Sequence, residues 1–218
     1  MGDIWAVVPI KEIEGAKQRL ASLLTPAQRR ELAAVMAEEV LASLAAVTAL
    51  AGIVVVTLDP QATQLAQRIG ARVLTDGARD GHTGAVTAAV RLLAREGRGG
   101  MMTIPGDIPR ATADEVATVL AAHRAAPSFT IVPAHDDHGS NAVVCSPPDA
   151  VPLRFGDDSF FPHLDAARAR GVEPTIVRLP GIGMDIDHPA DVAKFVRMMP
   201  PMRTRTLGLL EAFGCRSR

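Results

Sequence analysis

The chain has 218 residues, enough for one large domain with a substantial buried core. Its formal net charge of −1, pI near 6.6 and aromatic content of 3% disfavour a general nucleic-acid-binding protein. Two cysteines give no disulfide framework, no apolar run is long enough to span a bilayer, and no secretory signal is recognised, so we expect a cytoplasmic protein without a membrane partner.

The first half of the chain alternates apolar runs with amphipathic helices. Residues 4–10 are continuously apolar, as expected for a strand covered on both faces. Thr25 and Gln28 around Pro26 predict a helix start with a capping box. This order predicts a parallel α/β sheet whose ligands lie beyond the carboxyl ends of the strands. The later predicted strands are 52–57, 71–75 and 101–104, and the predicted helices are 61–69, 85–96 and one from a second capping box at 112–115 to about 125.

The second half departs from this alternation. Two strands, 129–133 and 141–146, are predicted to follow one another without a helix between them. A helix ending near Gly171, a strand at 175–179 and a helix from Pro189 to about Met198 come next. We expect one domain over residues 1–200 and a C-terminal tail over 201–218, with a short docked helix around 207–213.

Two acidic loops follow predicted strands. Asp185 and Asp187 stand at positions i and i+2, so in an extended segment their side chains project to the same side. Asp107 lies in a second loop, far upstream. Carboxylate oxygens suit Mg²⁺, and three of them at one sheet edge predict a site for one or two Mg²⁺ ions. The alternative, in which Asp187 caps the next helix and the others are turn residues, stays open.

A basic segment follows the first predicted strand. Lys11, Lys17 and Arg19 place positive charge where the phosphates of a nucleotide would need it. Taken alone, these residues are explained somewhat better by a solvated basic turn. The chain has no GxxxxGK[ST] motif and no GxGxxG motif after a strand, so Walker-type and dinucleotide sites lack their signature.

Two small loops could hold an anion. Gly139-Ser140-Asn141 and the segment from Gly156 to Ser159 each offer backbone N–H groups and a hydroxyl, and the second opens a predicted helix. Ser159 could instead be an ordinary N-cap. The histidines show no spacing typical of a zinc site.

Together these segments resemble the guanylyltransferases of coenzyme F420 biosynthesis. That family is similar to the wider nucleotidyltransferase fold that includes the molybdenum-cofactor guanylyltransferase. The resemblance covers residues 4–198 and is carried by residues 8–11 with 16–20, 105–109, 140–142, 155–160 with His163, and 184–187 with Pro189.

The resemblance implies a single-domain, three-layer α/β/α nucleotidyltransferase (Rossmann-like) fold with a mostly parallel central sheet. It implies transfer of GMP from GTP to phosphoenolpyruvate, 3-phospho-D-glycerate or 2-phospho-L-lactate, with release of pyrophosphate. It also implies a possible hand-over to a downstream transferase of the pathway, and a monomer or homodimer. The implied site residues are Asp107, Asp185 and Asp187 for metal, Asp107, Lys17 and Arg19 for catalysis, Lys11, Lys17, Arg19, Gly81 and Thr83 for the nucleotide, and Ser140, Gly156 and Ser159 for the acceptor.

The chain also departs from the family pattern. Glu12 stands where Pro is frequent, Gln18 where Ser is frequent, and His82 lies between Gly81 and Thr83 where the family usually has Gly-Leu-Asn. The last change leaves the recognition of the base open. Two alternatives remain: a nucleotidyltransferase for another metabolite such as molybdopterin, and a catalytically silent nucleotide-binding protein.

Overall fold

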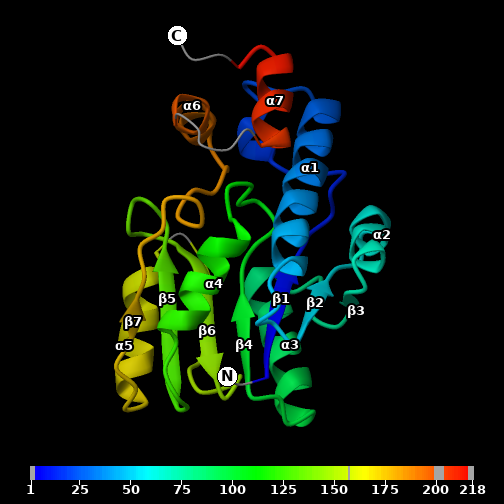
Figure 1. The fold of residues 1–218 in the computed structure, drawn as a ribbon. Helices are drawn as coiled ribbons and strands as arrows, with labels where there is room; N and C mark the ends of the chain where they lie inside the picture. The colour runs from blue at the N-terminus through cyan, green and yellow to red at the C-terminus, as the bar shows by residue number, and fades with distance from the viewer. Residues whose placement is uncertain (1–2, 157, 199–203, 216–218) are drawn as a thin grey trace.

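A seven-stranded sheet with the order β3-β2-β1-β4-β6-β5-β7 runs through the centre of the protein (Figure 1). The computed structural model describes residues 3–156, 158–198 and 204–215. The predicted boundary at residues 200 and 201, together with residues 202–203 and 216–218 of the predicted tail, lies outside these ranges. The strands are β1 (Ile4–Pro9), β2 (Gly52–Val56), β3 (Arg72–Leu74), β4 (Gly100–Thr103), β5 (Ser128–Pro133), β6 (Ser140–Ser146) and β7 (Thr175–Ile176).

The sheet is mostly parallel, as predicted. Among the described strands, β6 alone runs against its neighbours, β4 and β5. The register between β5 and β6 shifts next to Pro133, so that Asn141 is an extra residue on β6. Such a bulge re-aims the side chains beside it. The predicted strand at 175–179 was too long, because only residues 175–176 pair with β5 before the chain turns away.

The helices begin where local signals place them, with one exception. Thr25 caps α1 in the predicted capping box, in which Gln28 Oε1 accepts the Thr25 N–H at 2.9 Å. The helix predicted from residue 85 begins at Gly81 instead. Gly84 lies inside this helix and does not break it. A Cβ at this position would lie 2.2 Å from Asp80 Cβ, so the glycine is needed for close packing. The helices are α1 (Pro26–Ala45), α2 (Pro60–Arg68), α3 (Gly81–Arg95), α4 (Ala113–Ala122), α5 (Phe160–Ala169), α6 (Pro189–Arg197) and α7 (Arg205–Ala212), with a 3-10 turn η1 (Gln18–Leu20).

Two apolar clusters cover the two faces of the sheet. Ala6 and Val8 pack with α1, α2 and α4 on one face, and Val7 packs with α3 and α5 on the other. This alternation along β1 explains why the strand is apolar throughout. The arrangement confirms the predicted three-layer α/β/α fold (Figure 1). Among the described helices, none combines the length and the apolar character needed to cross a membrane.

A third apolar cluster lies beyond one end of the sheet, where η1, the start of α1, α6 and α7 meet (Figure 1). Met184 and Ile186 are buried in this cluster, with exposures of 1% and 0%. Asp185 and Asp187 alternate with these two buried residues along the chain. Helix α7 is held to α1 by Glu39, whose carboxylate accepts the Thr206 hydroxyl hydrogen at 2.6 Å.

Candidate active site

Lys17 joins the first basic loop to both acidic loops. Its ammonium nitrogen lies 2.7 Å from Asp107 Oδ2 and 2.6 Å from Asp187 Oδ1. These carboxylates are 90 and 170 residues away along the chain. Burial alone would lower the pKa of Lys17, but the charges of Asp107 and Asp187 raise it above its usual value. Lys17 has φ 54° and ψ 42°, in the left-handed region that a non-glycine residue seldom adopts.

Asp185 completes the acidic group. The Asn141 amide donates to Asp185 Oδ1 at 3.1 Å and to the Ile182 carbonyl at 3.0 Å, so the β6 bulge holds this carboxylate in place. Burial raises the pKa of Asp185, and the negative charges of Asp107 and Asp187 raise it further. Burial also acts to raise the pKa of Asp187, but Lys17 outweighs this and holds the value below its usual range. The site therefore carries more negative than positive charge around Asp185.

The three carboxylates fit a hard divalent cation in their chemistry. Within the described ranges, no three carboxylate, histidine or cysteine side chains form a ready metal-binding group. The Lys17 ammonium instead stands between Asp107 and Asp187, at a position where positive charge is stable. Oxygen ligands of this kind suit Mg²⁺, and such an ion would relieve the repulsion that raises the pKa of Asp185.

Arg19 and Lys11 lie at the rim of this group. The Arg19 side chain is 54% exposed, and its guanidinium lies 3.9 Å from Asp187 Oδ2 and 3.2 Å from His188 Nε2. Lys11 is exposed at the end of β1. Burial lowers the pKa of His82 to about 4, Asp107 opposes this, and Lys11 adds to it. His82, at the start of α3, thus interacts electrostatically with both the loop of Lys11 and the loop of Asp107.

The residues at the start of α3 that are predicted to bind the nucleotide contact the acceptor loop, the segment around Phe155 and Gly156 that is predicted to bind the acceptor. Thr83 accepts the Phe155 N–H at 3.0 Å and donates to the Phe155 carbonyl at 3.3 Å, so its hydroxyl hydrogen is already used. The His82 ring packs against Phe155 in a tilted arrangement, with centroids 4.3 Å apart. Gly81 begins the helix, and Gly156 follows Phe155 directly. The two loops predicted to bind different substrates are therefore in direct contact.

The two serines predicted for the acceptor meet in a buried hydrogen-bond network. Ser159 donates its hydroxyl to Ser140 Oγ at 3.0 Å, and His163 Nδ1 lies 2.9 Å from the same oxygen. Ser159 is at the N-cap position of α5 but caps no backbone N–H, so the N-cap interpretation of its side chain is wrong. The network connects α5 to the first residue of β6, next to Asn141.

Glu115 is a supporting residue that the pattern assigned to a local role. The Thr112 side chain accepts the Glu115 N–H as predicted, but the Glu115 carboxylate does not complete the capping box. It accepts the N–H groups of Gly181 at 2.8 Å and Ile182 at 2.7 Å. A Cβ at Gly181 would lie 2.3 Å from the Arg110 carbonyl, so glycine is required there. Glu115 thus fixes the loop that leads to Asp185, and only a three-dimensional contact reveals it.

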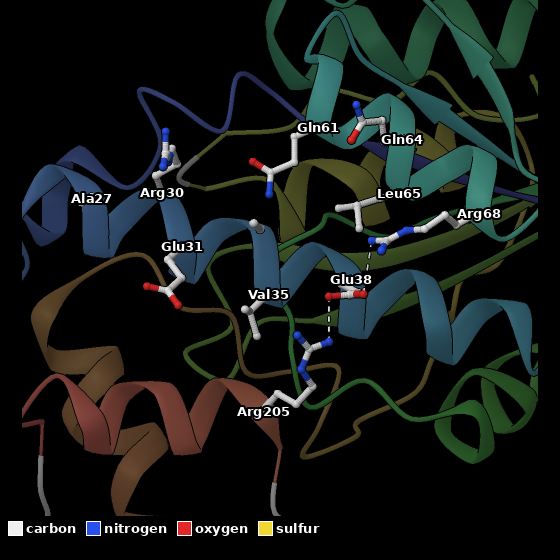
Figure 2. A pocket seen from close by; sticks show the side chains of 11 residues that line it. Ala27, Arg30, Glu31, Val35, Glu38, Gln61, Gln64, Leu65, Arg68 and Arg205 are labelled. Atoms are coloured by element: carbon white, nitrogen blue, oxygen red, sulfur yellow. Dashed lines mark hydrogen bonds and ion pairs between the residues drawn. The ribbon is translucent and has the colours of Figure 1, made fainter.

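A hollow of about 510 Å³ lies elsewhere, between α1, α2 and α7 (Figure 2). Among its lining residues, Arg68 and Arg205 both contact Glu38, at 3.3 and 2.7 Å. None of the predicted site residues lines it. The hollow therefore has no part in the candidate site.

Comparison with known proteins identifies the family of this chain. The family described as "Guanylyl transferase CofC like" matches residues 4–207. A phosphoenolpyruvate guanylyltransferase of Rubrobacter xylanophilus is 35% identical over 191 residues, which cover 88% of this chain and 92% of the relative. A 3-phospho-D-glycerate guanylyltransferase of Colwellia psychrerythraea is 30% identical over 196 residues, which cover 90% and 92%.

A solved structure shares the fold at lower sequence identity. A chain of Desulfovibrio desulfuricans G20, assigned to the nucleotide-diphospho-sugar transferases, has a TM-score of 0.77 and 18% identity. The match covers 97% of this chain and 95% of that one. At this identity the likeness concerns the architecture alone.

Proposed function

Since the chain belongs to the CofC-like guanylyl transferase family, we propose that it transfers GMP from GTP to a phosphorylated three-carbon acid in coenzyme F420 biosynthesis. Pyrophosphate is the second product. Phosphoenolpyruvate and 3-phospho-D-glycerate are the first acceptors to test, because relatives that match nearly the whole chain are named for them. 2-Phospho-L-lactate pairs the same two anionic groups on three carbons and is the third.

The observation that carries this proposal is the bridge from Lys17 to Asp107 and Asp187. It brings the basic loop and both acidic loops, which are far apart in sequence, to one point. Reactions at phosphoryl groups ask little covalent chemistry of the protein and depend on positioning and on neutralising charge. A cluster of carboxylates beside a lysine and an arginine supplies the groups for both.

Asp107, Asp185 and Asp187 would hold one or two Mg²⁺ ions, which when bound neutralise charge on the nucleotide phosphates. With its two carboxylates so engaged, Lys17 would turn to the phosphates of GTP, as its neighbour Arg19 can do from the rim. Arg19 can grip a phosphate bidentately because its guanidinium is largely exposed.

On the other side of the site, Ser140, Gly156 and Ser159 would hold the acceptor. The acceptor's phosphate oxygen would then attack the α-phosphorus of GTP in line, with pyrophosphate as the leaving group. The contact between Thr83 and Phe155 keeps the nucleotide loop and the acceptor loop in a fixed relation, which favours this alignment.

The direct test is an assay of pyrophosphate release with GTP, MgCl₂ and each of the three acids. We expect one acid to give pyrophosphate and a guanylylated product of the corresponding mass, and excess EDTA to stop the reaction. ATP, CTP and UTP serve as nucleotide controls. Failure of all three acids with GTP, or equal rates with the other nucleotides, would contradict the proposal.

A further inference from the structure

His163 is the third member of the buried network formed by Ser140 and Ser159. The ring is 1% exposed and lies between Phe155 and Phe129, with centroids 5.0 and 6.4 Å away. Its two nitrogens meet different partners: Nε2 lies 3.0 Å from the Arg154 N–H, and Nδ1 lies 2.9 Å from Ser140 Oγ. The ring thus joins the acceptor loop to the start of β6.

The contact with Arg154 fixes the position of the ring hydrogen. A backbone N–H can only donate, so Nε2 must be the unprotonated nitrogen. Burial lowers the pKa of His163 to about 4, so the ring is neutral at pH 7. A neutral imidazole carries one N–H, which must then be on Nδ1 and must donate to Ser140 Oγ.

The Ser140 hydroxyl therefore has its acceptor capacity filled. Its oxygen accepts one hydrogen from His163 Nδ1 and one from the Ser159 hydroxyl, which uses both lone pairs. Its own hydrogen is left over, and within the described ranges no acceptor is recorded for it. A buried hydroxyl hydrogen without an acceptor is costly, and an anionic ligand would satisfy it.

We propose that His163 is a positioning residue that holds the Ser140 hydroxyl as a hydrogen-bond donor toward the anionic acceptor. The inference rests on the proposed function at one point, namely that Ser140 contacts the acceptor. Without the Nδ1–H of His163, the Ser140 hydrogen could turn inward to the ring, and the site would present a lone pair to a negative charge. His163 thus determines whether the Ser140 hydroxyl presents its hydrogen or a lone pair to the acceptor.

Two variants distinguish the roles of the two ring nitrogens of His163. His163→Asn keeps an amide N–H near the Nδ1 position and loses the acceptor for Arg154. His163→Gln places its amide near the Nε2 position and loses the donor to Ser140. We expect His163→Gln to raise the KM for the acceptor roughly tenfold, with His163→Asn within roughly threefold of wild type, because a donor to an anion is a strong hydrogen bond. The KM for GTP should change in neither.

His123 provides a matched control at the opposite end of the sheet. It is partly buried, and both of its ring nitrogens contact hydroxyls, at 2.9 Å to Thr130 and 3.0 Å to Ser146. His123→Gln should leave the KM for the acceptor unchanged. An equal effect of His123→Gln and His163→Gln would mean that loss of a buried histidine, and not of its donor, weakens acceptor binding, and would overturn the proposal.

The wild-type protein allows a test without variants. Long-range ¹H–¹⁵N correlation spectra of the histidine rings should show His163 neutral at pH 7 with its hydrogen on Nδ1. A hydrogen on Nε2 would overturn the proposal, whatever the activity.

A double-mutant cycle distinguishes this proposal from the proposed function. Ser140→Ala should raise the KM for the acceptor, and His163→Gln should add little in that background, because both act through the same hydroxyl. An unchanged KM in Ser140→Ala would contradict the placement of the acceptor itself, and with it the inference. A large KM effect of Ser140→Ala together with a fully additive effect of His163→Gln would contradict the inference alone.

Discussion

The Lys17 ammonium and the Asp187 carboxylate, 170 residues apart in the chain, lie 2.6 Å from one another. The same ammonium contacts Asp107, so one lysine balances two carboxylates that would otherwise repel each other. In the proposed reaction a divalent cation would take over this balance and leave the lysine for phosphate. In this proposal, Lys17 and the metal ion would therefore compete for the same carboxylates.

The first prediction follows from this competition. Lys17→Met should lower the melting temperature in EDTA, because Asp107 and Asp187 lose their partner, and Mg²⁺ should restore it more than it stabilises wild type. Turnover should fall by roughly 100-fold or more, since the positive charge that Lys17 would bring to the GTP phosphates is lost. Thermal scans with and without MgCl₂ and a pyrophosphate assay measure both effects.

Lys194, an exposed lysine on α6, gives the control. Lys194→Met should respond to Mg²⁺ as wild type does. If Mg²⁺ stabilises Lys17→Met no better than wild type, the carboxylates do not bind the ion at that position.

The second prediction concerns Asp185. Asp185→Asn removes a carboxyl group whose pKa is already raised by burial and by Asp107. The amide oxygen of the new Asn side chain can still accept a hydrogen bond from Asn141. The melting temperature should stay the same or rise, while pyrophosphate release falls by roughly 100-fold or more if a metal ligand is lost. Asp165→Asn, on an exposed part of α5, should change neither. A fully active Asp185→Asn would end the assignment of Asp185 to the metal.

The third prediction concerns the loop before the acidic segment. Glu115→Gln leaves one of the two N–H groups, that of Gly181 or Ile182, without its acceptor, which should cost roughly 1 to 3 kcal/mol of unfolding free energy. Because this loop leads to Asp185, we also expect a higher Mg²⁺ concentration at half-maximal activity. Urea denaturation and a Mg²⁺ titration of the rate test the two parts.

The exposed neighbour Asp114 is the control, and Asp114→Asn should preserve both properties. A stability loss in Glu115→Gln with no change in the Mg²⁺ dependence would separate the loop from the metal site.

The fourth prediction is a dependence of stability on pH. His163 has a folded-state pKa of about 4 against an ordinary value of 6.5, so the unfolded chain binds the proton more readily between these values. The contribution of His163 is complete above pH 6.5 and is lost as pH falls toward 4, by about 3 kcal/mol at pH 4. Urea denaturation from pH 4.5 to 7.5 should show a smaller slope in His163→Asn than in wild type. Equal slopes would mean that the ring is not held neutral by the fold.

The sequence was most informative where a signal is local. The strand β1 follows a two-residue period, and the structure buries its alternate residues on opposite faces of the sheet. The Thr25–Gln28 capping box is equally local and is present. These features need no knowledge of the remaining chain.

Hydrogen-bond partners that are far apart in the sequence could not be predicted in the same way. The pattern assigned Glu115 to its own helix end, but its carboxylate binds residues 181 and 182, 66 and 67 positions later. Thr83 was assigned to the nucleotide, and its hydroxyl is bound to Phe155, 72 positions away. In both cases the fold decides which partner lies near the side chain.

The cluster formed by η1, α6 and α7 has a consequence for how the protein would fail on warming. Met184 and Ile186 attach the acidic segment to this cluster, which is separate from the two clusters on the sheet faces. The short helices that pack on the start of α1 in this cluster can detach while the seven strands remain paired. Heat inactivation would then precede the loss of β-structure, and cooling after brief exposure would bring the enzyme back.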